Sequence, residues 1–179
     1  MEELEFIATL LDPKTQNVAF QKLLSEYQRP LYSHIRNIVL NHDDADDVLQ
    51  NTFVKVFQHL KNFKGESKLF SWMYRIATNE AITFINKKAK RNGITSEAMQ
   101  TRIVENLKAD DYFDGNEIQI KLQKAIALLP QKQQLVFKMR YYEEIKYEDM
   151  SEILGTSVGA LKASYHHAVK KIENYMTSN

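Results

Sequence analysis

Apolar residues recur at three- and four-residue steps along most of the chain, the spacing of side chains that share one face of an α-helix. The pattern is clearest between Asp43 and Arg91, where it predicts two long helices separated by a short loop at Phe63–Ser67. Ser67 is a favourable N-cap residue for the second helix. The residues that we expect to be buried are Ala45, Leu49, Phe53, Val56 and Leu60 on the first helix, and Leu69, Met73, Ile76, Ala77, Phe84 and Ile85 on the second.

Shorter amphipathic segments flank this pair of helices. A helix over residues 2–11 is expected to end before Pro13, and a helix over 16–27 is expected to be kinked or restarted by Pro30. Pro130 separates helices over 118–129 and 131–142. A short helix, a turn at Gly155 and a long helix over 157–175 follow. Two helices joined by such a turn are typical of a helix-turn-helix.

Residues 92–117 differ from the segments on both sides. Asn92-Gly93 opens this stretch, its apolar periodicity is weak, and acidic side chains outnumber basic ones. Such a segment is expected to tether two domains rather than to form one. The predicted fold is therefore all-α. It has two small helical domains, residues 1–91 and 118–179, joined by a flexible acidic linker at 92–117, and the C-terminal domain is a helix-turn-helix.

The composition agrees with a helical protein and excludes some chemistry. The 179 residues include 5 Gly and 3 Pro, so helix breakers are few. The absence of Cys excludes disulfides, thiolate nucleophiles and thiolate metal sites, and it fits a reducing cytosol. The N-terminus is acidic where a signal peptide is basic, and no apolar run approaches the roughly 20 residues that a membrane span needs.

Charge is unevenly distributed although the whole chain carries a net charge of only +1. Between Lys61 and Arg91, eight basic side chains accompany two acidic ones. The helix after Ser67 also has a second stripe, opposite its apolar one, formed by Lys68, Ser71, Arg75, Asn79, Ile82 and Asn86. A solvated helix face usually mixes both signs of charge. A one-signed stripe with neighbouring aromatic residues instead favours nucleic acid, since phosphates bind cations and unstacked bases bind aromatic and amide groups.

Three ordered motifs carry a resemblance to a known family. Asp46–Gln50 (DDVLQ), Phe63–Ser67 (FKGES) and Trp72–Asn79 (WMYRIATN) resemble region two of bacterial sigma factors, most closely the extracytoplasmic-function (ECF) subfamily. The C-terminal third resembles region four of the same family. The resemblance implies a bacterial, cytoplasmic transcription initiation factor that binds core RNA polymerase and promoter DNA, with no catalysis, no cofactor and no metal. It leaves open whether an anti-sigma factor restrains the protein.

The resemblance also assigns residues to the promoter. The first domain is expected to open the minus-ten element and hold its single strand through Phe63, Lys64, Gly65, Ser67, Lys68, Arg75 and Asn79. In this reading Phe63 is a wall for an extruded base, Ser67 and Asn79 bond to its edge, and Arg75 anchors a phosphate. The second domain is expected to read the minus-thirty-five element as duplex. Its contacts are Lys162 and Lys170 to phosphates, and Ala163, His166 and His167 to base edges.

The polymerase contact is expected on the helix before the loop, opposite its buried face. Asp47, Gln50, Asn51, Val54 and Phe57 match the positions at which family members meet the polymerase clamp. An exposed Phe and Val beside amides fit an interface better than solvent. On the last helix the opposite side, Val158, Leu161, Tyr165, Val169 and Ile172, is expected to be core.

Three alternatives remain beside this interpretation. Asp43–Asp47 has the DDxxD spacing with which helical isoprenoid synthases bind magnesium, but helix capping by a solvated turn explains it more simply. His166 and His167 could suggest a metal pair, yet neighbours on a helix point about 100° apart. A helix-turn-helix regulator with an N-terminal sensory domain would keep its basic surface in the C-terminal domain, whereas here the first domain carries the larger positive stripe.

Overall fold

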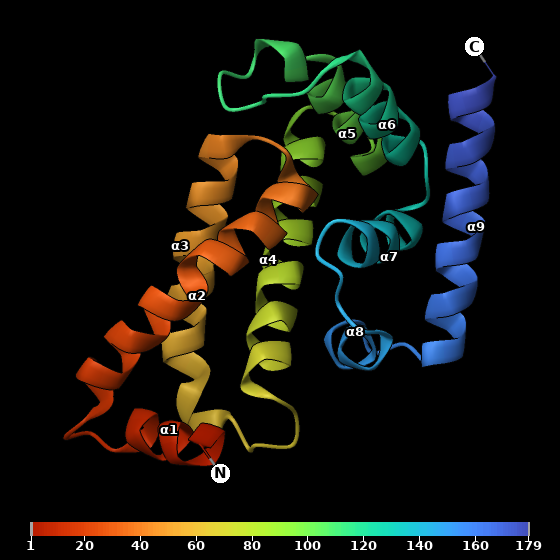
Figure 1. Ribbon diagram of the computed structural model, residues 1–179. Helices are drawn as coiled ribbons and strands as arrows, with labels where there is room; N and C mark the ends of the chain where they lie inside the picture. The colour runs from red at the N-terminus through yellow and green to blue at the C-terminus, as the bar shows by residue number, and fades with distance from the viewer. Residues whose placement is uncertain (1, 179) are drawn as a thin grey trace.

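The structure, a computed structural model, describes residues 2–178, and all regular structure among them is helical. Figure 1 shows an upright group of helices beside a second group that ends in the long α9. The helices are α1 (Glu2–Leu11), α2 (Gln16–Val39), α3 (His42–His59), η1 (Leu60–Asn62), α4 (Leu69–Arg91), α5 (Ser96–Glu105), η2 (Leu107–Ala109), α6 (Glu117–Ala127), α7 (Gln131–Tyr141), α8 (Tyr147–Leu154) and α9 (Val158–Thr177). The predicted all-α class is confirmed.

The first group is built from α1 to α4, with α2, α3 and α4 packed against one another. Leu31, Val48 and Ala77, one from each of these helices, lie in a common apolar cluster. Pro30 does not restart α2, which is continuous from Gln16 to Val39. The proline is exposed, so its ring faces solvent rather than the core. A second cluster lies where α1 meets the loop before α4.

The second group contains α6 to α9, and its last two helices form the predicted helix-turn-helix. Gly155 ends α8 with a left-handed backbone (φ 65°), a conformation that glycine adopts without the steric strain of a side chain. Ser157 then caps α9, accepting a hydrogen bond from the N–H of Ala160 at 3.2 Å. Both local features follow from the residue types, and the layout was predictable for that reason.

The linker is more ordered than we expected. Residues 96–105 form α5, whose Met99 and Val104 are buried, and Leu107 follows them into the interior. This helix packs against α4 on one side and α6 on the other. Its apolar residues have helical spacing, but the acidic residues between them masked the pattern. The linker is therefore a structural part of this arrangement as well as a connection.

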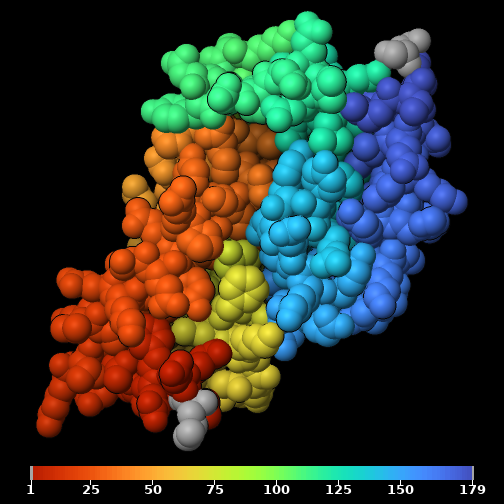
Figure 2. Space-filling view, in the orientation of Figure 1, coloured from red at the N-terminus to blue at the C-terminus, as the bar shows by residue number. Residues whose placement is uncertain are grey.

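The two groups of helices share a core. Val136, Met139, Met150 and Ile153 of the second group lie in the same apolar cluster as Leu31, Ala77 and Ile85 of the first, along the junctions of α8 with α4 and α7 with α2. In Figure 2 the blue second group lies directly against the yellow-green α4. The sequence predicts each helix-forming segment, but it does not show that the two groups close on each other.

Candidate nucleic-acid interface

The loop between η1 and α4 is fixed at both ends and exposed in the middle. Phe63 is only 8% exposed and packs its ring 5.0 Å from that of Trp72, so it is part of the core. This corrects our expectation that Phe63 forms the open wall of a base pocket. Gly65 has a left-handed backbone (φ 72°) with free space around it, and Lys64 and Lys68 are exposed. Phe63 thus anchors a loop whose cationic side chains face solvent.

The start of α4 is capped from a distant part of the chain. Ser67 is not the N-cap; Lys68 occupies that position and its side chain forms no capping bond. Instead, the carboxylate of Glu3 in α1 accepts a hydrogen bond from the N–H of Leu69 at 2.6 Å. The expected cap was wrong because the acceptor comes from 66 residues away, which local sequence does not reveal.

The polar stripe of α4 divides into exposed and covered parts. Arg75 and Asn79 are exposed one turn apart, as the spacing predicts. Ser71 is only 1% exposed, and its hydroxyl has no hydrogen-bond partner among the described residues. Farther along, Asn86 accepts a hydrogen bond from Ser96 of α5 at 2.6 Å. The stripe is therefore not a free surface along its whole length.

The helix-turn-helix covers part of this stripe. Lys68 Nζ donates to Asp149 of α8 at 2.8 Å. This hydrogen bond and the charge of the same carboxylate raise the pKa of Lys68, and more distant Glu152 and Glu3 add to the shift. At the turn after α8, a Cβ on Gly155 would lie 3.3 Å from Nη2 of Arg75. The first helix of the helix-turn-helix and the turn after it thus occupy space beside the residues expected to bind single-stranded DNA.

A buried polar link joins the two domains behind this contact. His34 of α2 is fully buried, with Nδ1 at 2.8 and 2.9 Å from the two carboxylate oxygens of Glu143, which follows α7. The hydroxyl of Thr78 donates to the carbonyl of Tyr74 at 2.7 Å, so its oxygen accepts from Nε2–H of His34, also at 2.7 Å. The contact between His34 and Glu143 therefore ties α2 and α4 to the segment after α7. Sequence analysis missed this link, since its partners are 109 residues apart.

One lysine at the same junction is buried. Lys138 of α7 is 3% exposed and lines a small gap with Ile82 and Ile85 of α4 and Gln100 of α5. Burial lowers the pKa of Lys138 to about 8, because its charged form loses hydration there. Closure of the domains is therefore less favourable when Lys138 is protonated than when it is neutral.

The face of α3 expected to meet polymerase is open. All five of its predicted residues, Asp47, Gln50, Asn51, Val54 and Phe57, are exposed. Val54 is 54% and Phe57 44% exposed, and the rings of Phe57 and of Phe20 in α2 form a T-shaped pair with centroids 5.0 Å apart. An apolar pair presented to solvent between polar residues has the composition of a protein-binding surface.

The predicted duplex-reading side of α9 is also open. Lys162, Ala163, His166, His167 and Lys170 are all exposed, whereas Leu161, Ala168 and Ile172 are buried. Lys162 lies over the ring of Tyr147 at 5.8 Å. The rings of His166 and His167 are 6.0 Å apart and inclined at 57°, which does not direct them at one ion. Val158, Tyr165 and Val169, expected in the core, are only half-buried.

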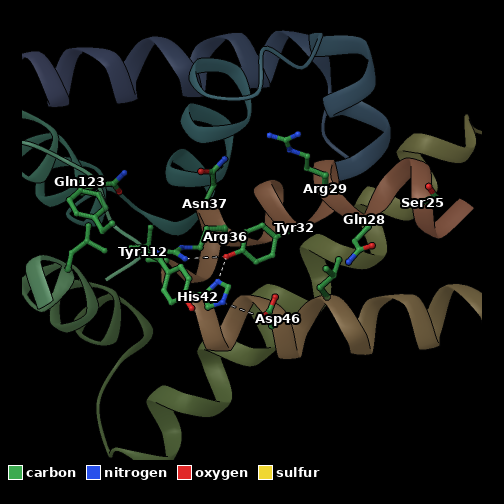
Figure 3. A pocket seen from close by; sticks show the side chains of 14 residues that line it. Ser25, Gln28, Arg29, Tyr32, Arg36, Asn37, His42, Asp46, Tyr112 and Gln123 are labelled. Carbon is green, nitrogen blue, oxygen red and sulfur yellow. Dashed lines mark hydrogen bonds and ion pairs between the residues drawn. The ribbon is translucent and has the colours of Figure 1, made fainter. Parts of the chain in front are cut away.

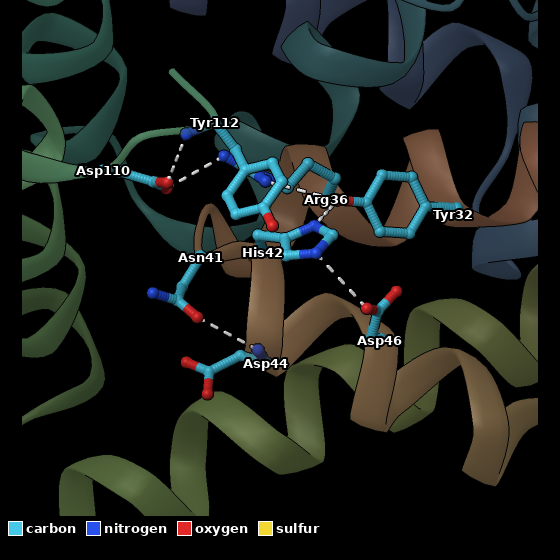
Figure 4. Close-up of polar contacts among 8 residues, drawn as sticks. All are labelled: Tyr32, Arg36, Asn41, His42, Asp44, Asp46, Asp110 and Tyr112. Carbon is cyan, nitrogen blue, oxygen red and sulfur yellow. Dashed lines mark hydrogen bonds and ion pairs between the residues drawn. The ribbon is translucent and has the colours of Figure 1, made fainter.

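A groove of about 780 Å³, which no sequence pattern predicts, lies between α2, the start of α3 and the linker (Figure 3). Figure 4 shows how the linker is held there. Arg36 pairs with Asp110 at 2.9 Å, and the ring of Tyr112 stacks on His42 at 3.8 Å. The acidic linker thus neutralises an arginine of α2 while the domains are closed.

The aspartates of the DDxxD spacing have structural roles. The side chain of Asn41 caps α3 by accepting from the N–H of Asp44 at 3.0 Å, and the Asp44 carboxylate pairs with Lys88 of α4 at 2.7 Å. Asp46 lies 3.4 Å from Nε2 of His42. These separate partners support the capping interpretation over a diphosphate site.

Comparisons with known proteins agree with this geometry. Residues 23–91 match the model of Sigma-70 region 2, and residues 119–172 match Sigma-70, region 4. The ECF RNA polymerase sigma-E factor of Haemophilus influenzae is 27% identical over 87% of this chain and 86% of its own length. The ECF RNA polymerase sigma factor SigW of Bacillus subtilis is 28% identical over 83% of each chain.

Solved structures share the fold. CnrH in complex with the cytosolic domain of CnrY matches with a TM-score of 0.70 at 17% identity, over 99% of this chain and 98% of that one. RpoE of Bartonella quintana in complex with the anti-sigma factor NepR matches with a TM-score of 0.64 at 19% identity, over 89% and 98%. The family models and the curated relatives together define the class as a transcription initiation factor. The chain belongs to the ECF sigma factors of bacterial RNA polymerase, which direct promoter-specific initiation of transcription.

Among the described residues no helix combines the length and apolar character required to cross a bilayer.

Proposed function

We propose that the first domain binds core polymerase through the open face of α3, and opens and holds the minus-ten element through the loop and stripe of α4. The second domain reads the minus-thirty-five element through α9. The protein performs no catalysis, needs no cofactor and acts in the bacterial cytoplasm. The domain limits are 1–91 and 118–179, with 92–117 as linker. The observation that carries the proposal is the placement of exposed Lys64, Lys68, Arg75 and Asn79 along one loop and helix face.

The chemistry of strand opening explains this arrangement. Removing a base from the stack costs a few kcal/mol, which the protein offsets by holding the extruded nucleotide. Asn79 has an amide for a base edge, and Arg75, one turn earlier, reaches the adjacent phosphate. Lys64 and Lys68 attract the strand, and Gly65 lets the backbone approach closely. Phe63 does not contact the strand in this scheme and anchors the loop in the core.

The closed arrangement must change before this face can bind DNA. In this structure Asp149 neutralises Lys68, and the turn at Gly155 lies beside Arg75. We therefore propose that α8 leaves α4 when the protein engages polymerase and promoter. Two proteins of this fold were solved with partner proteins, one of them an anti-sigma factor. A partner of that kind, by holding α8 on α4, would keep the promoter surface covered.

Permanganate footprinting of a promoter bound by the reconstituted holoenzyme tests the single-strand assignment. Asn79→Ala should reduce strand opening and weaken the preference at one single-stranded position, because it removes the amide and leaves the fold unchanged. Core binding should remain at the wild-type level, and a pre-melted promoter should restore opening but not the preference. A variant that melts promoters normally with unchanged preference would show that the loop and stripe are only scaffold.

The competing function is a helix-turn-helix regulator that never joins polymerase. Only the exposed α9 face, common to both classes, favours it. A pull-down with core polymerase in the absence of DNA separates the two, since a regulator of that type would not be retained.

A further inference from the structure

The helix α1 lies outside both family matches, which cover residues 23–91 and 119–172. It nevertheless reaches the segment that we assign to single-stranded promoter DNA. Figure 1 shows α1 across the foot of the first domain, below the ends of α3 and α4. What α1 contributes there can be read from two kinds of contact, one polar and one apolar.

The polar contact is the cap on α4. The first N–H groups of a helix have no partner within the helix, and together they carry a partial positive charge. Neither Ser67 nor Lys68 supplies a side-chain acceptor to the first N–H groups of α4. The Glu3 carboxylate does so, at 2.6 Å from the N–H of Leu69. Leu69, the first residue of α4 after the loop, is thus held by a charged group of α1.

The apolar contact fixes the other end of the loop. Ile7 and Leu10 of α1 lie in one buried cluster with Leu60, Phe63 and Leu69. Phe63 precedes the exposed residues of the loop and Leu69 follows them. Both anchors therefore pack in the cluster that α1 completes, while Lys64 to Lys68 span the distance between them.

We propose that Glu3 is a positioning residue for promoter opening, which holds the Phe63–Lys68 loop in the conformation that receives the single strand. A loop held in its bound conformation loses less conformational freedom on binding, so more of the interaction is available to stabilise the open strand. Glu3 does not itself touch DNA in this scheme. The inference rests on the proposed role of the loop and adds a determinant that lies outside the family matches.

Three variants in full-length protein test the proposal: Glu3→Ala removes the acceptor, Glu3→Gln keeps an acceptor without the charge, and Glu5→Ala is a control on the same helix. Glu5 is exposed. The readouts are permanganate reactivity of the reconstituted holoenzyme and sequence preference on a pre-melted promoter. The affinity for core polymerase and the thermal unfolding midpoint show whether the fold is intact.

Glu3→Ala should slow strand opening about fivefold, the factor equivalent to the stability usually lost with a helix cap, and blur the preference on pre-melted DNA. Glu3→Gln should restore most of both, because its amide oxygen can accept from Leu69. Glu5→Ala should match the wild type. Unchanged opening and preference in Glu3→Ala would overturn the proposal. Equal impairment of the Gln and Ala variants would also overturn it, since the hydrogen bond would then not be the cause.

Asn79→Ala, measured in parallel, separates this inference from the function on which it rests. If Asn79→Ala impairs opening and Glu3→Ala does not, only the role of Glu3 is rejected. If neither variant affects opening or preference, the assignment of the loop to single-stranded DNA fails, and the proposal for Glu3 fails with it.

Discussion

The two faces of the first domain that we propose to be functional differ in accessibility. On α3, Val54 and Phe57 are exposed with polar neighbours. On α4, the second domain neutralises Lys68 and lies against Arg75. The face assigned to polymerase is therefore available in the closed molecule, while the face assigned to promoter is partly covered. This difference favours an order of events in which polymerase binds first and promoter DNA binds after the domains separate.

The largest expected effect on this difference comes from the buried link between the domains. His34→Ala leaves Glu143 facing a buried site, with only a 3.5 Å contact from Asn37. Breaking one partner of such a pair costs about 3 kcal/mol or more. The closed form should therefore open. Because the chain has no Cys, dyes on introduced Gln21→Cys and Glu173→Cys report the distance between domains.

A double-mutant cycle with Glu143→Ala assigns the effect to the link between domains. If His34 stabilises closure through Glu143, the second substitution should add little to the first. Fully additive losses would mean that His34 acts inside the first domain alone, and an unchanged dye distance in His34→Ala would reject the link.

The pH dependence of closure should report Lys138. Its pKa is lowered to about 8 by burial in the closed form and returns toward the ordinary lysine value of 10.5 when the site is hydrated. The closed form then binds fewer protons between these values, so closure becomes more favourable as pH rises from 8 to 10, by up to about 3 kcal/mol. Below pH 8 both forms keep the proton and the penalty is constant.

Lys138→Met removes the buried charge and supplies the control for this titration. It should close more tightly at pH 7 and lose the dependence on pH between 8 and 10. Burial raises the pKa of Tyr142 to about 12 and that of Tyr74 still further, so these groups titrate above the window. A wild-type protein whose dye distance is constant from pH 7 to 10 would contradict the prediction.

The open face of α3 can be tested without disturbing closure. Gln50→Ala with Phe57→Ala should weaken core binding by about 2 kcal/mol, because a large apolar anchor is lost from an interface. The dye distance should not change, since both side chains are exposed in the closed molecule. His59→Ala, at the exposed end of the same helix, is the matched control. Unchanged affinity in the double variant would place the polymerase contact elsewhere.

Local properties were predictable from sequence, and contacts between distant segments were not. Helical spacing correctly gave the exposure of Phe57, Arg75 and His167, because period and burial follow from one helix at a time. The prediction that Ser67 caps α4 was wrong. Ser67 has the right chemistry for a cap, but the acceptor in the structure is Glu3 of α1.

Long-range partners caused the remaining differences. Phe63 could have faced a base or a core, and only the packing of α1 and Trp72 decides between them. Closure of the helix-turn-helix on α4 depends on apolar side chains, among them Met150 and Ile153, that lie in a cluster with residues of α4. Their pattern therefore predicts burial but not the partner, and the same holds for the ordered linker.

The smallest expected effect concerns α9, whose predicted DNA-reading side is open like the α3 face. Lys162→Ala should weaken binding to all duplexes by a similar factor and reduce the slope of log affinity against log salt by roughly one, because one phosphate contact is lost. His167→Ala should instead change which duplexes are preferred. Since both residues are exposed in the closed molecule, these effects should be the same in wild type and in the opened His34→Ala variant. Duplex affinity that rises on opening would show that closure also masks α9. In that case α9 would be a covered face like α4, and only the α3 face would be open in the closed molecule.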